Sequence, residues 1–217
     1  MVIAAVVAAS RTSLFHARHL EVSGTSSLSR ADVLEIAGLD RRTNVAWLDE
    51  DAAERRLEAN AWVADAEISV SIPFTVEISV TEREPVAVAW DGRRRVLLAG
   101  DGTSLGSPGP ERGLPLIELP PSGVSEGTAA SPQGAARALG AMAPDLRSRV
   151  ARVRVLLDGT LEVWLRSGPR VSFGAPDAVG LKARAIARAL AWAEREGEQI
   201  TALSVVSPAS LAATLAP

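Results

Sequence analysis

The sequence contains no cysteine and only two histidines, His16 and His19, among its 217 residues. The absence of cysteine excludes disulfides, thiolate metal sites and cysteine nucleophiles. The two histidines are three positions apart in a segment that we expect to be extended, so their side chains point to opposite faces. We therefore predict no metal site, no Ser-His-Asp triad and no bound cofactor.

Basic residues are not in excess either. The net charge is −3 and the isoelectric point is about 5.5, which argues against a general nucleic-acid-binding protein. Hydrophobic residues make up 47% of the sequence and charged residues 23%, as in ordinary globular proteins. The length predicts one or two folded domains.

The sequence also lacks an apolar run long enough to cross a bilayer. Its first nine residues, MVIAAVVAA, are all apolar, but nine helical residues rise only ~13.5 Å against a hydrocarbon core of ~30 Å. A signal peptide would carry basic residues before its apolar core, and none are present. The segment is then either an N-terminal core strand or the end of a transmembrane helix that begins upstream. We favour the second interpretation for the reason given below.

Capping residues and periodicity predict that the first part of the chain forms a strand, two helices and two strands. Ser29 and Asp32 have the spacing of a capping box, and Gly38 is placed to end that helix. The expected elements are a strand ending at Gly24, helices capped by Ser29 and by Asp49, and half-buried strands at 64–72 and 75–81. This order predicts a compact α+β unit with both helices on one sheet face.

The second part of the chain is predicted to be rich in β-structure, with one long helix. The expected elements are a hairpin at 86–99, a core anchor at 114–117, a short helix at 133–142, a hairpin of 153–157 and 161–165, a strand at 170–173, a helix from 179 that ends at Gly197, a strand at 200–206 and a small-residue tail at 211–217. An apolar stripe marks the buried side of the long helix, with Lys182, Arg184, Arg188 and Arg195 expected on its surface.

No group of side chains carries a catalytic pattern. Glu82 and Glu84 lie on the same side of a strand end, but no nucleophile or second acid-base group accompanies them. Arg93, Arg94 and Arg95 are interpreted as the solvated tip of a hairpin. At least four of the five scattered tryptophans are expected to pack in the core or on a sheet. We therefore predict that the protein is not an enzyme.

Several short sequence features follow one another in a characteristic order. They are Phe15, Val22-Ser23-Gly24, Asn44, Trp62-Val63, Pro73, Glu82-Arg83-Glu84-Pro85-Val86-Ala87, Trp90, Asp101-Gly102, Leu114-Pro115, and Val171-Ser172-Phe173-Gly174 followed by Lys182. In this order they resemble the FtsQ/DivIB family of bacterial cell-division proteins. The chain departs from the family in lacking the glycine of the turn before Asn44.

The resemblance implies a domain organisation and a location. Residues 1–14 would be the end of a truncated transmembrane segment and a short linker, 15–84 a POTRA domain, 85–208 an FtsQ-type β domain, and 209–217 a C-terminal tail. The protein would then be a single-pass cell-membrane protein at the division septum, with its soluble part on the extracytoplasmic side.

The resemblance also implies a function in binding. The protein would be a divisome scaffold that holds FtsL-like and FtsB/DivIC-like partners and so links early division assembly to septal peptidoglycan synthesis. An alternative is a POTRA-containing polypeptide-transport or outer-membrane-assembly chaperone. Such chaperones carry several POTRA repeats or a long series of alternating strands, and this chain shows one such unit.

We expect the partner to bind along the last predicted strand. A chain-terminal strand often lies at a sheet edge, where unpaired N–H and C=O groups can pair with an incoming segment. The resemblance indicates the same place, since in FtsQ-like proteins the FtsB-type partner adds along the C-terminal strands. The predicted contact residues are Thr201, Ala202, Leu203, Ser204, Val205, Val206 and Ser207.

Overall fold

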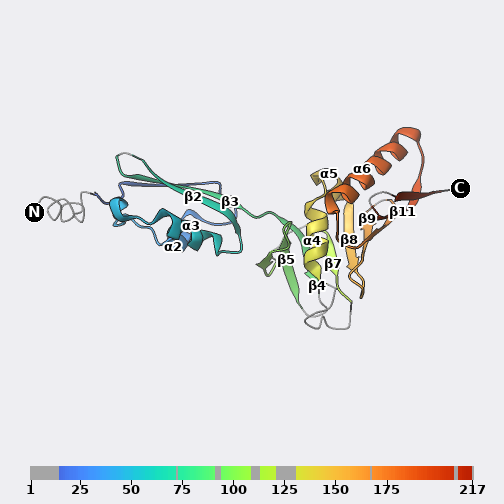
Figure 1. The fold of residues 1–217 in the computed structure, drawn as a ribbon, viewed down its shortest axis with the longest axis horizontal. Coiled ribbons are helices and arrows are strands. Elements are labelled where there is room, and N and C mark those ends of the chain that lie inside the picture. The colour runs from blue at the N-terminus through green and yellow to red at the C-terminus, as the bar shows by residue number, and fades with distance from the viewer. Residues whose placement is uncertain are drawn as a thin grey trace, which may run out of the picture. The chain divides into compact units, whose positions relative to one another are not determined.

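The computed structural model describes residues 15–71, 73–90, 94–108, 113–120, 131–166, 168–207 and 210–216. The chain divides into two compact units, Met1–Arg83 and Glu84–Pro217 (Figure 1). The predicted α+β class is confirmed, as are the order strand, helix, helix, strand, strand in unit 1 and the long C-terminal helix followed by a strand in unit 2.

Unit 1 is a three-stranded sheet covered by two helices. Its elements are β1 (His19–Ser23), α2 (Arg30–Ala37), the 3-10 helix η2 (Val45–Trp47), α3 (Glu50–Glu58), β2 (Val63–Ser71) and β3 (Thr75–Glu82). The strand order is β1-β3-β2, with β1 parallel and β2 antiparallel to the central β3. Figure 1 shows α2 and α3 along one side of this sheet. Their buried residues include Val33, Ala37, Ala53 and Leu57, which share a core with Ile68, Val76, Ile78 and Val80.

The helix caps of unit 1 agree with the sequence prediction. The Ser29 side chain accepts a hydrogen bond from the Asp32 backbone N–H, and the Asp32 carboxylate accepts from the Ser29 N–H. Gly38 ends α2, and the Asp49 side chain caps α3. The burial of β2 departs at its start from the regular alternation expected of a half-buried strand at 64–72. Ala64 is exposed and Val63 is buried, because a bulge shifts the register between Val63 and Asp65.

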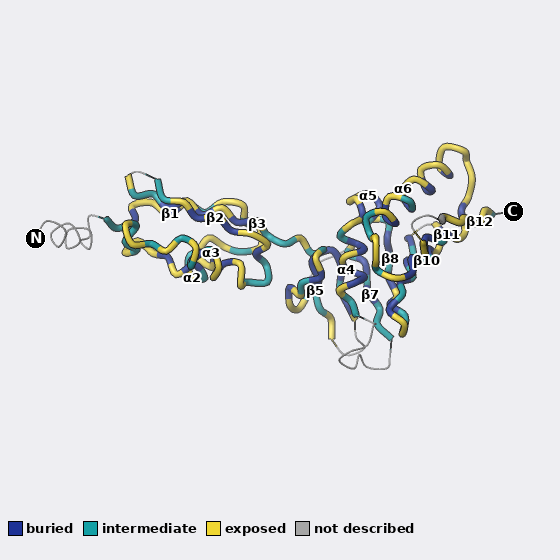
Figure 2. The backbone as a smooth tube through the Cα atoms, in the orientation of Figure 1, coloured by how far each residue is buried: buried dark blue, intermediate teal, exposed yellow. Residues whose placement is uncertain are grey.

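Unit 2 is built on one nine-stranded sheet. Its elements are β4 (Pro85–Trp90), β5 (Arg95–Ala99), β6 (Ser104–Gly106), β7 (Leu116–Glu118), α4 (Pro132–Gly140), α5 (Pro144–Arg149), β8 (Val150–Val155), β9 (Leu161–Leu165), β10 (Arg170–Gly174), α6 (Val179–Glu196), β11 (Ile200–Ser207) and β12 (Ser210–Leu215). The strand order is β12-β11-β10-β9-β8-β7-β4-β5-β6. Buried residues of α4 and α6 share one core with alternate residues of the strands (Figure 2).

Two expectations for the second part of the chain were wrong, and so was one that concerned the tryptophans of both parts. Residues 210–215 of the expected tail form a strand, β12, which pairs with β11. Lys182 was placed on the surface, but its side chain is fully buried. At least four of the five tryptophans were expected in the core or on a sheet, but Trp47 in η2 and Trp192 in α6 are exposed and lie on no strand. Smaller aliphatic and alanine residues fill most of the core instead.

The expected membrane segment at residues 1–9 lies outside the described residues. Among the helices that the structure describes, none is both long and apolar enough to cross a membrane.

Glu82 fastens the loop between β1 and α2 to the end of β3. Its carboxylate accepts hydrogen bonds from the backbone N–H groups of Ser26, Ser27 and Leu28, at 2.9–3.1 Å, and from the Ser26 hydroxyl at 2.8 Å. Burial alone would raise the pKa of Glu82, but these hydrogen bonds outweigh it and lower the pKa from 4.5 to about 2. Glu82 is thus a structural group and not half of a catalytic pair.

We predict that Gly24→Ala strongly destabilises unit 1. Gly24 has φ of +81°, and an added Cβ would lie 2.0 Å from the Val80 carbonyl oxygen in β3. Conformational strain and the clash together should lower the free energy of unfolding by about 2–4 kcal/mol. Gly197 is the control, since its φ is +70° and nothing lies within 4 Å of the added Cβ. Gly197→Ala should cost about 1–2 kcal/mol. The free energy of unfolding of each full-length variant is measured in urea. Equal losses of stability for Gly24→Ala and Gly197→Ala would contradict the predicted clash.

Glu82→Gln should remove an acid-sensitive part of the stability of unit 1. Because the folded-state pKa is depressed, the ionised carboxylate stabilises the fold above pH 4.5, and this stabilisation is lost as the pH falls towards about 2. The variant should be less stable at pH 7 by about 1–3 kcal/mol and should lose less on acidification. Hydrogen exchange of the Ser27 and Leu28 amides measures this locally. Glu58→Gln, at an exposed position in α3, is the control. It should change neither the stability at pH 7 nor the stability lost on acidification.

Candidate partner-binding edge

The predicted contact strand, residues 201–207, lies inside the sheet and not at its edge. β11 pairs with β10 in parallel, with Val171 opposite Leu203, and with β12 antiparallel, with Leu203 opposite Ala213. Over residues 202–204, β11 is therefore paired on both sides. The expectation that β11 itself offers an open edge is corrected, because the expected tail occupies that edge as β12.

The side chains of β11 divide between the core and the surface. Leu203 and Val205 are buried, at 2% and 1% exposure, and belong to the core of unit 2. Ser204 is half-buried. Thr201, Ala202, Val206 and Ser207 are exposed. These four have the most accessible side chains of the seven predicted residues, and Ser204 is partly accessible.

β12 forms the edge of the sheet within the part of the chain that the structure describes. The Ala216 N–H donates to the Gln199 carbonyl at 2.7 Å, and the Thr201 hydroxyl donates to the Thr214 carbonyl at 3.1 Å. The main-chain groups of these even-numbered residues thus point towards β11. Because main-chain direction alternates along a strand, those of Leu211, Ala213 and Leu215 point outward.

The residues of β12 whose main-chain groups point away from β11 also carry apolar side chains. Leu211 is 46% exposed and Leu215 is 39% exposed. They lie on the same face as Ala213, which pairs with the core residue Leu203. An incoming strand would therefore find main-chain donors and acceptors together with two leucine side chains that it can cover.

Sequence reasoning missed β12 because its residues have little β-propensity. The segment SLAATL consists largely of small residues, and alanine is depleted in strands. The signal that could have revealed it is the period of two in Leu211, Ala213 and Leu215. Tertiary pairing with β11 determines the conformation here, and propensity does not.

Lys182 anchors the segment that joins β10 to α6. Its Nζ donates to the Ala175 carbonyl at 2.8 Å and to the Asp177 carboxylate at 2.5 Å, and it lies 5.3 Å from the centre of the Phe173 ring. The hydrogen bond from Lys182, and then its charge, lower the pKa of Asp177. The side chain of Asp177 remains 70% exposed, whereas that of Lys182 is fully buried. The lysine is therefore the fixed member of this ion pair.

Within the described parts of the chain, the remaining polar residues form no arrangement that suggests catalysis or metal binding. Among the described residues, no three His, Asp or Glu side chains gather as a metal site would require. The side chain of Glu84 is 85% exposed and pairs with Arg147 at 3.8 Å. Of the predicted hairpin tip, Arg93 lies outside the described residues, and Arg95 lies 5.9 Å from the centre of the Trp90 ring.

We predict that Lys182→Ala destabilises unit 2 more than Lys182→Met. Alanine leaves a cavity in the core and should cost about 2–5 kcal/mol. Methionine keeps an apolar stem but leaves the Ala175 carbonyl without its donor, which should cost about 1–3 kcal/mol. Asp177→Asn should have a smaller effect than either, because that carboxylate is solvated. Urea unfolding of the full-length variants measures the order, and an Asp177→Asn loss as large as that of Lys182→Ala would contradict it.

Comparison with known proteins agrees with this architecture. The family model "POTRA domain, FtsQ-type" matches residues 15–83. The chain is similar to proteins named Cell division protein FtsQ: that of Mycobacteroides abscessus is 27% identical over 79% of this chain and 54% of its own length. The Streptomyces bingchenggensis protein is 28% identical over 85% and 73%, and that of Myxococcus fulvus 30% identical over 75% and 60%.

The similarity extends beyond the POTRA match. The alignment with the Streptomyces bingchenggensis protein covers 193 residues, whereas the family model covers unit 1 alone. The chain spans between 54% and 73% of the length of these three relatives. The resemblance drawn from the sequence is thereby confirmed: residues 15–83 match the FtsQ-type POTRA family, and most of the chain is similar to FtsQ cell-division proteins of bacteria.

Proposed function

We propose that this protein acts in bacterial cell division as a non-enzymatic scaffold at the septum. Support for a division role comes from the FtsQ-type POTRA match and from relatives that are named as cell division proteins. Support for a binding role comes from unit 2, where β12 presents outward main-chain groups and two exposed leucines. Catalysis would need a clustered polar site, and the described residues offer no such cluster with catalytic geometry.

The scaffold would be held at the cell membrane by a helix N-terminal to the described residues. Its two units would then stand on the extracytoplasmic side. The proposed partners are FtsL-like and FtsB/DivIC-like proteins, through which the scaffold would connect early division assembly to septal peptidoglycan synthesis.

The partner would add a strand to β12, and the position of β12 at the sheet edge is the observation that supports this proposal. Its main chain would pair with Leu211, Ala213 and Leu215, and its side chains would contact the exposed residues of β11. Of the residues predicted from the sequence, Thr201, Ala202, Val206 and Ser207 remain candidates for such contacts. Leu203, Ser204 and Val205 would contribute indirectly, by fixing β12 to the rest of the sheet.

The alternative, a POTRA-containing transport or assembly chaperone, has less support. Such proteins pass client chains along several POTRA units, whereas the described residues hold one three-stranded unit of this kind. The alignments with FtsQ proteins also continue through unit 2.

Two neighbouring proline substitutions test the edge. Ala213→Pro removes an N–H that points outward, so the fold should persist while affinity for a soluble FtsB-like segment from the same organism falls. The loss of one hydrogen bond and the poor fit of proline between paired strands should weaken binding about tenfold or more.

Ala212→Pro is the matched control, because its N–H points towards β11. It should loosen β12 itself, with faster hydrogen exchange in β11 and β12, whereas Ala213→Pro should leave that exchange unchanged. Affinity that is unaffected in a well-folded Ala213→Pro protein would contradict strand addition at β12.

A further inference from the structure

The face of the unit 2 sheet opposite α4 and α6 carries a group of arginines around one tryptophan. Residues paired across β8, β9 and β10 fall in rows: Val153, Val163 and Val171 face the core. The neighbouring rows face the other way, since successive side chains point to opposite faces. The opposite face holds Arg152, Arg154, Trp164, Glu162 and Arg170, followed on β7, β4 and β5 by Glu118, Trp90 and Arg95.

Three guanidinium groups contact the Trp164 ring. Arg152, Arg154 and Arg170 lie 4.8, 5.0 and 5.6 Å from its centre. Cation–π attraction and the flat surface of the indole hold these long side chains in place. Their side chains are nevertheless 42%, 45% and 55% exposed. The arginines are thus ordered before any ligand arrives, which reduces the entropy that binding must overcome.

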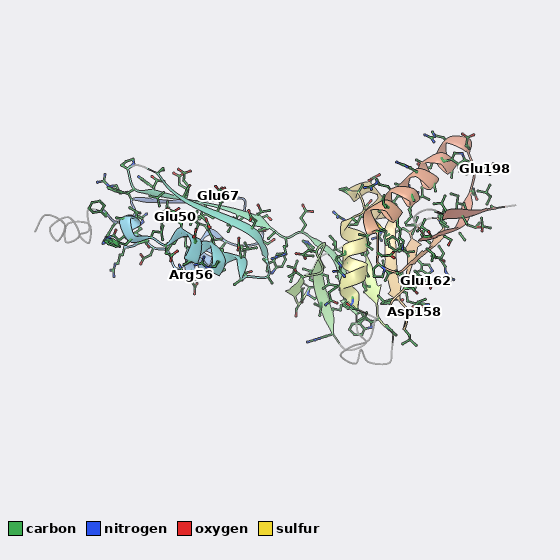
Figure 3. All side chains as sticks on the ribbon, in the orientation of Figure 1. Glu50, Arg56, Glu67, Asp158, Glu162 and Glu198 are labelled. Atoms are coloured by element: carbon green, nitrogen blue, oxygen red, sulfur yellow. The ribbon has the colours of Figure 1, made fainter. Side chains whose placement is uncertain are left out.

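The carboxylates on this face do not balance the arginines. Glu118 accepts from Arg152 at 3.4 Å and lies 3.5 Å from Arg154, so that two guanidinium groups share one carboxylate. Glu162, labelled in Figure 3, pairs with Arg170. With Arg95, four arginines accompany two glutamates among the described residues of this face, which leaves two positive charges there although the net charge of the chain is −3. Each guanidinium has five N–H donors, more than these carboxylates can occupy.

An apolar hollow adjoins the arginines, at the carboxyl ends of the parallel strands β4, β7 and β8. Its volume is about 540 Å³, and it shares Trp90, Glu118 and Arg154 with the charged group. The rest of its lining is largely apolar and includes Leu119, Pro120 and Leu157. Leu157 is 67% exposed and Trp90 is 38% exposed. The hollow therefore offers room for an apolar side chain directly beside a cationic surface.

We propose that this face binds an acidic polypeptide segment. Its carboxylates would pair with Arg152, Arg154 and Arg170, and an apolar residue would enter the hollow beside Trp90. The apolar hollow favours a polypeptide over a phosphate polymer, which has nothing to place there. Tryptophan and arginine are also the residues most enriched at energetically important positions of protein interfaces. The proposal goes beyond strand addition at β12, because it depends on side-chain charge and not on the main chain.

Charge reversal tests the proposal with a defined probe. The probe is a short synthetic peptide of alternating glutamate and leucine, and its binding to the full chain is measured by fluorescence anisotropy at low and at physiological salt. The double variant Arg152→Glu/Arg170→Glu should weaken binding about tenfold or more, with the largest loss at low salt. Arg184→Glu/Arg188→Glu on α6 makes the same change of charge on another surface and should weaken binding far less.

Further measurements separate the alternatives. Circular dichroism and hydrogen exchange of β9 establish whether the double variant is folded. If it is not, Arg154→Gln replaces it and should weaken binding severalfold. Equal weakening by the α6 variant, equal binding of a peptide with glutamine in place of glutamate, or tighter binding of polyphosphate than of the peptide would each overturn the proposal. Ala213→Pro should leave binding of this probe unchanged, so that failure here is distinguishable from failure of the β12 edge.

Discussion

Successive side chains in a strand point to opposite faces, and this alternation organises unit 2 more than any single contact does. One set of alternate residues, such as Val153, Val163 and Val171, forms the core with α4 and α6. The other set then necessarily faces away from both helices, where arginines, glutamates and a tryptophan occupy it. The same alternation acts on the main chain of β12, where it directs every second pair of N–H and C=O groups away from the sheet. The core, the charged face and the outward main-chain groups of β12 thus all follow from this alternation.

The two ends of the nine-stranded sheet differ in what they expose. β6, at one end, has three residues, and its central Leu105 is buried. β12, at the other end, has six residues, two of them exposed leucines. Short edge strands resist pairing with other chains, whereas a longer apolar edge invites it. β12 is joined to the sheet through β11, which pairs in turn with β10. The fully buried Lys182 stabilises this part of unit 2 by connecting the end of β10 to the start of α6.

The sequence predicted well those elements whose residues carry strong local signals. The capping box at Ser29, the cap at Asp49 and the periodic stripe of α6 are all present as expected. The failures occur where tertiary contacts override local preference. β12 is a strand because β11 pairs with it, although its residues are mainly small. Lys182 lies on the core side of α6 because a backbone carbonyl and Asp177 satisfy its charge there, which a helical-wheel argument cannot anticipate.

The candidate partner-binding edge was likewise only partly predictable from the sequence. The C-terminal location of the edge could be inferred from the sequence and the family, but the strand that forms it could not. The sequence did not single out Trp164 among the tryptophans, because its grouping with Arg152 and Arg170 depends on strand order and register, which link residues on three strands. Pairing register is set by the whole sheet, so no local pattern around any one of these residues reveals the group.

An edge and a charged face on one sheet select partners in different ways. Main-chain pairing at β12 tolerates many partner sequences, because every residue except proline offers the same N–H and C=O groups. The arginines around Trp164 instead discriminate by charge and accelerate encounter through long-range attraction that salt weakens. A partner that used both would gain by linkage, since binding at one surface raises its effective concentration at the other. Modest affinities at each surface would then suffice for stable attachment of such a partner, and the attachment would remain reversible.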